Sequence, residues 1–424
     1  MSKQQIQQKS VVIGGGIVGV CCALYLQKEG HQVWLIDPAA PGDSTAKWSC
    51  GQMAVSEIIP LSKPGILTRI PGWLLDQKGP LALRPAAIPT ILPWFLRFVA
   101  NARHSRIHAI AQEMATLTHE VYRDYAPLLA MCPDKQLLGQ RPVIEVFATA
   151  RGLEQERAHL QLRQALGFQA DTLNAQDIAE LEPALAGKFS HGLLFPDWCA
   201  VNDTQGFIAA LTAAFVRQGG TRIDTAAASL IETERQATGI KLHDGRILPA
   251  QHVVIAAGTG SRHFFRQLGI RVPLTGISGY QTLLPQPEVE FRHSVIYADG
   301  GFCFTPMTRG LQIGGTIEFA GPDAKPDFRR ADIILQKARQ LVPQLNTTVK
   351  EVGVGHRPFL PDTKPIIDRS RRLKNVLMAF GHGQLGLTLA ATTGRLIADL
   401  AAQRAGAQDL TPFSAYRFTQ GEEA

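Results

Sequence analysis

The sequence of 424 residues lacks the signals of several common protein classes. It has no uninterrupted run of the roughly 20 apolar residues that a membrane-spanning helix needs. Its lysines and arginines do not alternate with aromatic residues in a basic cluster, so we predict no nucleic-acid partner. The patterns GxSxG and GxxxxGK[ST] are also absent, which leaves hydrolase and kinase activities without support.

Cysteine is scarce, and its spacing shows no metal or disulfide framework. No C-x-x-C occurs, and the six cysteines are scattered over the chain. His104 and His108 are four residues apart but lack the acidic residue of HExxH, so we predict no metal site. The apolar run at residues 11–26 contains four glycines and lacks a cleavage site for a signal peptide. We expect a reducing compartment and a cytoplasmic protein.

The composition is that of a globular protein with a large interior. Hydrophobic residues make up 45% of the chain and charged residues 19%, and the length favours two domains. The formal net charge of +7 fits an anionic cofactor and an anionic substrate. It also leaves open a peripheral contact with an acidic membrane surface.

The clearest local motif is a glycine-rich turn near the N-terminus. Residues 10–37 read as strand, turn, helix and strand, with GxGxxG spanning residues 14–19. Such glycines let the backbone approach a pyrophosphate at the helix N-terminus, and a carboxylate ending the second strand can accept hydrogen bonds from ribose hydroxyls. This motif does not distinguish FAD from NAD. The cofactor-binding residues it predicts are Gly14, Gly16, Ile17, Val18, Gly19, Asp37 and Pro38.

Further along the chain, hydrophobic periodicity predicts the other main elements. Residues 107–129 have the spacing of one long amphipathic helix, and residues 276–319 predict an antiparallel sheet. Near the C-terminus we expect a loop at residues 354–368, a strand at 375–380, a glycine loop and a final helix.

The C-terminal part carries a family resemblance. Arg357 and Pro358 in VGHRPFLPDTKPIID, followed by GHGQLGLTLAATTGRLIADL, resemble the closing signature of the D-amino-acid oxidase superfamily of flavoproteins, and are most similar to its D-amino-acid dehydrogenases. The resemblance extends to the N-terminal unit and to VVIAAGTGS. It implies FAD as the cofactor and an α/β fold. In that fold, a Rossmann-like FAD-binding domain is built from discontinuous segments (1–60, 201–275 and 345–424). An inserted α+β substrate domain (61–200 and 276–344) contains an antiparallel sheet.

The same resemblance implies roles for individual residues. Arg357 matches the arginine that binds the substrate carboxylate, a role that suits a guanidinium with parallel donors. His382 lies in the glycine loop beside the flavin, and Tyr280, Tyr297 and Phe304 lie in the strands expected to form the substrate wall. The further cofactor-binding residues implied are Ser44, Ser49, Gly51, Ala257, Gly258, Gly381, Gly383, Gln384 and Gly386.

The implied function is oxidation of a small amino or imino acid, most simply of D configuration, by hydride transfer from the α-carbon to flavin N5. D-proline or hydroxy-D-proline fits this chemistry, and the electrons would pass to an acceptor such as a quinone. Two alternatives stay open: an oxidase of glycine or sarcosine type that uses oxygen, and a flavoprotein subunit of a larger complex.

One segment departs from the dehydrogenase pattern. Residues 44–51 read STAKWSCG where those enzymes more often carry an asparagine-containing run, so Lys47 and Trp48 put access to the flavin in doubt. The stretch from Pro71 to Phe98 is rich in proline and tryptophan, which leaves open peripheral contact at the inner face of the cytoplasmic membrane. Homo-oligomerisation is open as well.

Overall fold

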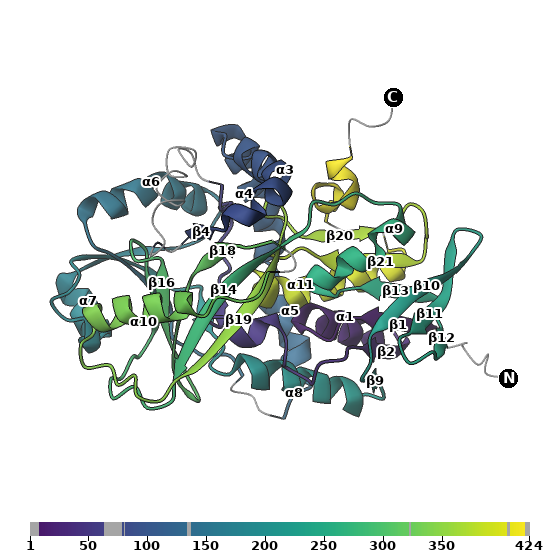
Figure 1. The fold of residues 1–424 in the computed structure, drawn as a ribbon, viewed down its shortest axis with the longest axis horizontal. Helices are drawn as coiled ribbons and strands as arrows, with labels where there is room; N and C mark the ends of the chain where they lie inside the picture. Colours follow the sequence, from purple (N-terminus) through teal and green to yellow (C-terminus); the bar gives the residue numbers. More distant parts are fainter. Residues whose placement is uncertain are drawn as a thin grey trace.

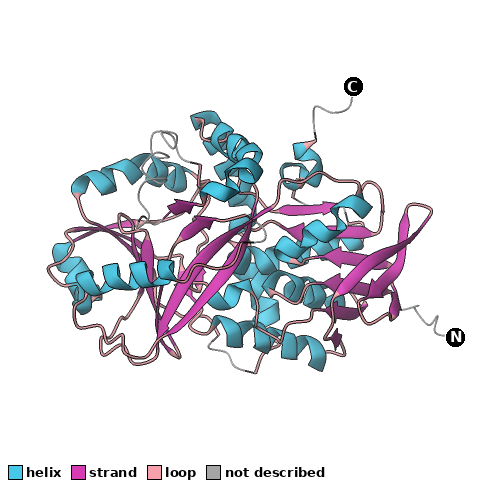
Figure 2. Cartoon of the chain, viewed as in Figure 1, coloured by secondary structure: helices cyan, strands magenta, loops and turns pink. Residues whose placement is uncertain are grey.

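The computed structural model describes residues 8–62, 79, 81–133, 137–321, 324–404 and 408–419. Two sheets lie side by side along the long axis of the molecule (Figures 1 and 2). The smaller sheet is near the N-terminus, and the larger one carries the long strands β14 and β19.

The smaller sheet has the predicted nucleotide-binding topology. Its strand order is β20-β21-β13-β1-β2-β9, and only β20 runs antiparallel to its neighbour. The central strands read as nearly continuous apolar runs because helices and a small hairpin sheet cover both faces. The strands and the connecting helix α1 are β1 (Lys9–Ile13), α1 (Ile17–Lys28), β2 (Gln32–Ile36), β9 (Thr221–Ile223), β13 (His252–Ile255), β20 (Ile366–Arg369) and β21 (Val376–Phe380).

Helices from distant parts of the chain pack on one face of this sheet. Helix α1 lies against α11 (Gly386–Ala401), and α8 (Thr204–Arg217) lies beside them. Two tyrosines fix the layer, since the hydroxyl of Tyr25 donates to the Asp124 carbonyl and that of Tyr125 to the Leu387 carbonyl, both at 2.6 Å.

The prediction of a single helix over residues 107–129 is wrong. The chain forms two helices, α4 (His104–Thr118) and α5 (Val121–Leu129), which are separated by His119 and Glu120, and the ring of His119 stacks on Phe168. Apolar residues continue at helical spacing across the break because both helices present a buried face to the same core.

The larger sheet confirms the antiparallel sheet expected at residues 276–319. Its order is β4-β18-β14-β17-β16-β15-β5-β7-β6, with β19 also paired to β14, and it is antiparallel except at β15–β5 and β18–β4. The elements of this part are β4 (Leu81–Leu83), β5 (Val143–Phe147), α6 (Ala150–Ala165), β6 (Asp171–Asn174), α7 (Ala175–Leu181), β7 (His191–Phe195), β14 (Thr275–Leu284), β15 (Ser294–Tyr297), β16 (Phe302–Met307), β17 (Gly310–Gly314), β18 (Ile317–Phe319) and α10 (Arg329–Leu341).

Strand β19 (Glu351–Phe359) corrects the loop expected at residues 354–368. It pairs with β14 over nine residues, from Thr275 opposite Phe359 to Leu283 opposite Glu351. The pairing places β19 in the larger sheet, although the range 345–424 assigned it to the cofactor domain. Conversely, α4 and α5 pack against α11 of the nucleotide-binding part, although the expected range of the substrate domain, 61–200, includes them. The domain ranges stay a prediction.

The remaining elements are short or peripheral. Residues 63–78 and 80 lie outside the described residues, and they include residues 71–78 and 80 of the proline- and tryptophan-rich stretch. Within the part that the structure describes, no helix combines the length and apolarity needed to cross a bilayer. The remaining short or peripheral helices and strands are β3 (Gln52–Met53), α3 (Ile88–Ala100), β8 (Cys199–Ala200), β10 (Ala227–Thr233), β11 (Gln236–Leu242), β12 (Ile247–Pro249) and α9 (Phe265–Leu268).

The contact between α1 and α11 gives a first prediction. A Cβ on Gly394 would lie 2.7 Å from the carbonyl carbon and oxygen of Cys21, and backbone atoms cannot rotate away. We expect Gly394→Ala to destabilise the protein by about 1–3 kcal/mol through overpacking. The urea midpoint of the purified variant measures this, and an unchanged midpoint would show that the two helices are not in close contact.

A second prediction concerns pH. His252 at the start of β13 is buried beside His31, and burial lowers the pKa of His252 to about 4. The unfolded chain takes up this proton near the ordinary value of 6.5, whereas the folded protein takes it up only near pH 4. The free energy of unfolding should therefore be unaffected by His252 above pH 6.5, and it should fall by up to roughly 3 kcal/mol as pH falls from 6.5 through 4.

Urea unfolding measured at several pH values tests this prediction. His252→Gln should flatten the dependence between pH 6.5 and 4, whereas His108→Gln, at an exposed position, should leave it unchanged. The same slope in both variants would contradict the assignment.

Candidate active site

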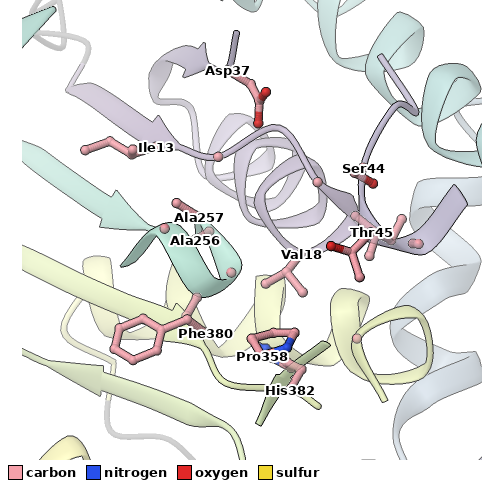
Figure 3. A pocket seen from close by; sticks show the side chains of 18 of the residues that line it. Ile13, Val18, Asp37, Ser44, Thr45, Ala256, Ala257, Pro358, Phe380 and His382 are labelled. Atoms are coloured by element: carbon pink, nitrogen blue, oxygen red, sulfur yellow. The ribbon is translucent and has the colours of Figure 1, made fainter. Parts of the chain in front are cut away.

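A cavity of about 490 Å³ opens where the two sheets meet (Figure 3). Three turns at the ends of β1, β13 and β21 line one part of it, and β19, the segment after β2 and the β10–β11 hairpin line the other parts. The predicted site residues that line it are Gly14, Gly16, Ile17, Val18, Asp37, Pro38, Ser44, Ser49, Ala257, Gly258, Arg357, Gly381, His382, Gly383, Gln384 and Gly386.

The turn after β1 requires its glycines. Gly14 has φ of 108°, and a Cβ there would lie 2.5 Å from the carbonyl oxygen of Ala256. Gly19 does not line the cavity, but a Cβ on it would overlap the Gly14 carbonyl, so it lets the helix close onto the strand. Helix α1 starts at Ile17, and its N-cap, Gly16, provides no side-chain cap. Its first backbone N–H groups therefore suit an anion such as pyrophosphate.

Two polar side chains on the same part of the cavity also suit a dinucleotide. The Asp37 carboxylate accepts hydrogen bonds from the backbone N–H groups of Gly15 at 2.5 Å and Ala39 at 2.8 Å, which fixes it at the end of β2. The Ser44 hydroxyl is buried without a hydrogen-bond partner among the described residues. Because a buried polar atom costs free energy when unpaired, a bound cofactor would satisfy it. These features fit FAD.

The loop after β21 is held in a tight conformation. Gly381 and Gly383 have φ of 82° and 56°, and the Gly383 N–H donates to the Pro358 carbonyl at 2.8 Å. His382 between them is buried, with Nε2 2.9 Å from the hydroxyl of Thr393 on α11. Burial lowers the pKa of His382 to about 3, so its ring is neutral at working pH and anchors the loop to α11.

The segment that departs from the dehydrogenase pattern lies between the cofactor turn and β19. Residues 45–48 form a 3₁₀ helix, and the Trp48 ring covers Gly353 of β19 so closely that a Cβ there would overlap it. The Thr45 hydroxyl donates to the His356 carbonyl at 3.3 Å. Lys47 forms an ion pair with Asp43 at 3.1 Å. Trp48 therefore lines the cavity and packs on the strand that carries Arg357.

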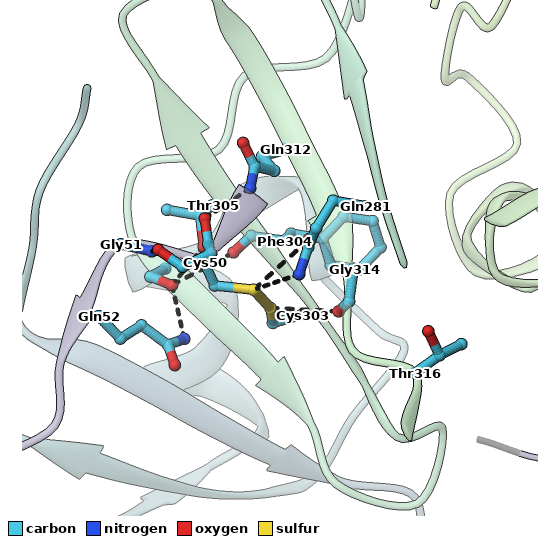
Figure 4. The surroundings of a disulfide bond; sticks show 12 residues. Cys50, Gly51, Gln52, Gln281, Cys303, Phe304, Thr305, Gln312, Gly314 and Thr316 are labelled. Carbon is cyan, nitrogen blue, oxygen red and sulfur yellow. Dashed lines mark hydrogen bonds between the residues drawn. A yellow bond between two sulfur atoms is a disulfide. The ribbon is translucent and has the colours of Figure 1, made fainter. Parts of the chain in front are cut away.

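The following residues tie this segment to the larger sheet (Figure 4). The Gln312 amide donates to the Ser49 carbonyl at 2.5 Å, and the Gln52 amide donates to the Ser294 hydroxyl at 2.9 Å. Cys50 is joined to Cys303 on β16 by a disulfide, which the scattered cysteines of the sequence did not lead us to expect. Gly51 does not line the cavity, and its carbonyl accepts a hydrogen bond from the Val201 N–H at 2.7 Å.

Arg357 on β19 presents a cation to the cavity. Its Nη1 donates to the Thr316 carbonyl at 3.1 Å, and its guanidinium lies over Gly279 of β14, where a Cβ would be 2.5 Å from Nη2. In the described part of the chain, no carboxylate lies within ion-pair distance of it. Burial lowers its pKa to about 10, so it remains charged at neutral pH. The wall is therefore suited to an anionic ligand.

Tyr280, Tyr297 and Phe304 do not line the cavity. Successive residues of a strand point to opposite faces, and since Gly279 lies under Arg357, Tyr280 points away from it. The Tyr280 hydroxyl donates to Glu318 at 2.6 Å, and burial raises its pKa to about 12. The ring of Tyr297 packs against Phe189 and Phe302, and that of Phe304 against Phe291 and Phe302.

Several cavity residues were not foreseen from the sequence. Thr45, Ala46 and Gly355 could have been predicted as cavity residues, because they lie next to or near the predicted site residues Ser44 and Arg357 in the sequence. Those contributed by the β10–β11 hairpin and its neighbours belong to no motif, because only the folded sheet brings them to the cavity. The latter group comprises Ala226, Ala227, His243, His263 and Phe264.

Comparisons with known proteins agree with this geometry. Residues 9–400 match the family model described as FAD dependent oxidoreductase. The D-amino-acid oxidase of Bradyrhizobium diazoefficiens is 30% identical over 414 residues, covering 96% of this chain and 98% of that protein. D-amino acid dehydrogenase 2 of Ralstonia nicotianae is 30% identical over 426 residues, covering 96% and 99%. The fold is similar to glycine oxidase from Geobacillus kaustophilus, with a TM-score of 0.72, 19% identity, and coverage of 97% and 99%. The chain thus belongs to the family of FAD dependent oxidoreductases.

Proposed function

We propose that this chain oxidises a small D-amino acid at its α-carbon and passes the electrons to a quinone or a similar acceptor. The names of the two relatives support an amino acid of D configuration. The net charge of +7 and the cationic cavity wall support an anionic substrate.

The observation that carries the proposal is the Arg357 guanidinium on the cavity wall. A partly buried cation without a carboxylate partner is costly, and an α-carboxylate can supply the missing charge through two parallel hydrogen bonds. The Thr316 carbonyl and the space above Gly279 already fix the guanidinium, so little ordering is needed on binding.

The other residues have supporting roles. When bound, FAD supplies the acceptor for the hydride of the α-carbon. The N-terminus of α1, Asp37 and Ser44 would hold its pyrophosphate, ribose and neighbouring polar groups. Arg357 fixes the carboxylate, so the remaining substituents of the α-carbon have defined directions, and one enantiomer presents its hydrogen correctly. His382, neutral and bound to Thr393, positions the glycine loop.

Anaerobic bleaching of the flavin absorbance tests the cofactor, the reaction and the substrate class together. We expect bleaching by D-amino acids and none by their L enantiomers, with D-proline or hydroxy-D-proline among the fastest. Bleaching by glycine or sarcosine alone would replace the proposal with an oxidase of that type. Bleaching by L-amino acids alone would contradict it.

The acceptor is tested separately. We expect the reduced enzyme to be reoxidised faster by a short-chain quinone than by air-saturated buffer, with little peroxide formed. Stoichiometric peroxide under air, together with no reaction with the quinone, would assign oxygen as the acceptor instead.

Replacing Arg357 tests the carboxylate contact. Arg357→Met removes a charge-assisted pair, and we expect kcat/KM to fall by about 30- to 1000-fold, equivalent to roughly 2–4 kcal/mol. Arg357→Lys keeps the charge but not the parallel donors, so its loss should be smaller. Steady-state kinetics with the flavin content measured in each variant provides the readout.

The matched control is Arg309→Met in the turn between β16 and β17, because Arg309 is exposed and pairs with Glu351. Its kcat/KM should stay within about twofold of the wild type. An Arg357→Met enzyme with full flavin content and unchanged kcat/KM would contradict the proposed carboxylate contact.

A further inference from the structure

Trp48 and Arg357 border the same cavity, and the register of the larger sheet fixes how far apart they lie. Strands β14 and β19 pair so that Gly279 stands opposite Gly355. The Arg357 guanidinium covers Gly279. The Trp48 indole covers Gly353, which lies two residues before Gly355 on β19. Residues two apart on a strand share a face and are separated by about 7 Å. The guanidinium and the indole are therefore neighbours on one face of the sheet.

The indole is held as a fixed wall of the cavity. A Cβ on Gly353 would overlap Cδ2, Cε2 and Cζ2 of the ring, so the ring rests directly on the strand backbone. The backbone on both sides of Trp48 is also bound. The Thr204 hydroxyl donates to the carbonyl of the preceding residue at 3.1 Å, and the Gln312 amide donates to the carbonyl of the following residue at 2.5 Å. A side chain fixed in this way acts as a steric limit and not as a gate.

The space between the indole and the guanidinium has a floor of glycine. Gly355 lines the cavity there, and a Cβ on it would lie 2.9 Å from the Thr45 carbonyl oxygen. Beside the indole the face of the sheet is already filled, because Gln281 stands opposite Gly353 and is buried, with its amide nitrogen 3.7 Å from Cys50 Sγ. A ligand bound at the guanidinium thus meets backbone below it and the indole at its end.

We propose that Trp48 determines substrate specificity by limiting the length of the substrate side chain. This inference rests on the proposed function, in which the Arg357 guanidinium holds the α-carboxylate. Apolar atoms approach no closer than about 3.5 Å, so roughly 3–4 Å of the 7 Å spacing stay free, enough for about two or three carbon atoms. The site therefore takes a short uncharged side chain or a small ring, as in D-alanine and D-proline. A side chain as long as that of D-phenylalanine collides with the indole.

Binding of carboxylic acids that lack an amine tests this limit without turnover. The FAD-loaded protein is titrated with straight-chain acids from propionate to octanoate, and the flavin absorbance is followed. Each added methylene favours binding in an open apolar site. In the wild type we expect the opposite, a dissociation constant that rises roughly tenfold or more between butyrate and octanoate. Trp48→Ala should remove most of that rise. Trp48→Phe keeps a ring on the strand and should move the limit by about one carbon or two.

Steady-state kinetics provides a second readout. With a water-soluble dye as acceptor, Trp48→Ala should raise the ratio of kcat/KM for D-phenylalanine to that for D-alanine by about tenfold or more. Lys47→Met is the matched control, because the Lys47 ammonium lies 5.6 Å from the centroid of the Trp48 ring but does not line the cavity. This variant should keep the chain-length profile and the kcat/KM ratio of the wild type.

Two results would overturn the proposal. One is a chain-length profile that both Trp48 variants share with the wild type while their flavin content is full. The other is an equal change of profile in Lys47→Met, since a loosened segment and not the indole would then set the limit. A protein that shows the expected length limit for carboxylic acids but is bleached by no D-amino acid would sustain the role of Trp48 and overturn only the proposed reaction.

Discussion

The structure depends on a single cation placed at the junction of two sheets. Arg357 belongs to the larger sheet, yet its guanidinium faces the cavity formed mainly by the nucleotide-binding sheet. Its position needs glycine at residue 279, where a side chain would occupy the same space, and it needs the Thr316 carbonyl as an acceptor. A positive charge held in this way has no described carboxylate to balance it, and we propose that this imbalance selects an anionic acid as the ligand.

The short segment between β2 and β3 contacts both sheets. Its residues line the cofactor cavity through Ser44 and Ser49, cover β19 through Trp48, and are bound to the larger sheet through Gln52. The segment that departs from the dehydrogenase pattern therefore contacts both the cavity and the strand that carries Arg357. Access to the cavity and the orientation of β19 depend on the same few side chains.

The sequence predicted those features that local chemistry determines. The glycine turn and the carboxylate at the end of β2 follow from one strand–turn–helix–strand motif, and the site role of the C-terminal glycine loop follows from the family resemblance. The structure brings Gly14, Asp37 and Gly383 to one cavity. Strand β19 was read as a loop because glycine and proline interrupt it, and only its pairing with β14 makes it a strand.

The direction of individual side chains could not be predicted from the sequence either. Tyr280 was expected in the substrate wall, but the register of β14 turns it toward Glu318 on the far face. Likewise, the pairing of Cys50 with Cys303 spans 253 residues, and no local pattern indicates it. Both features are set by contacts between segments far apart in the chain, which neither periodicity nor spacing reports.

The central claim is that Arg357 binds the carboxylate of the substrate beside the flavin. It is tested most directly by titrating the FAD-loaded protein with a carboxylic acid that lacks an amine, such as propionate, and following the flavin absorbance. The account predicts a saturable change that D-amino acids compete with, and no change in Arg357→Met with its flavin retained. Equally tight binding to that variant would contradict it.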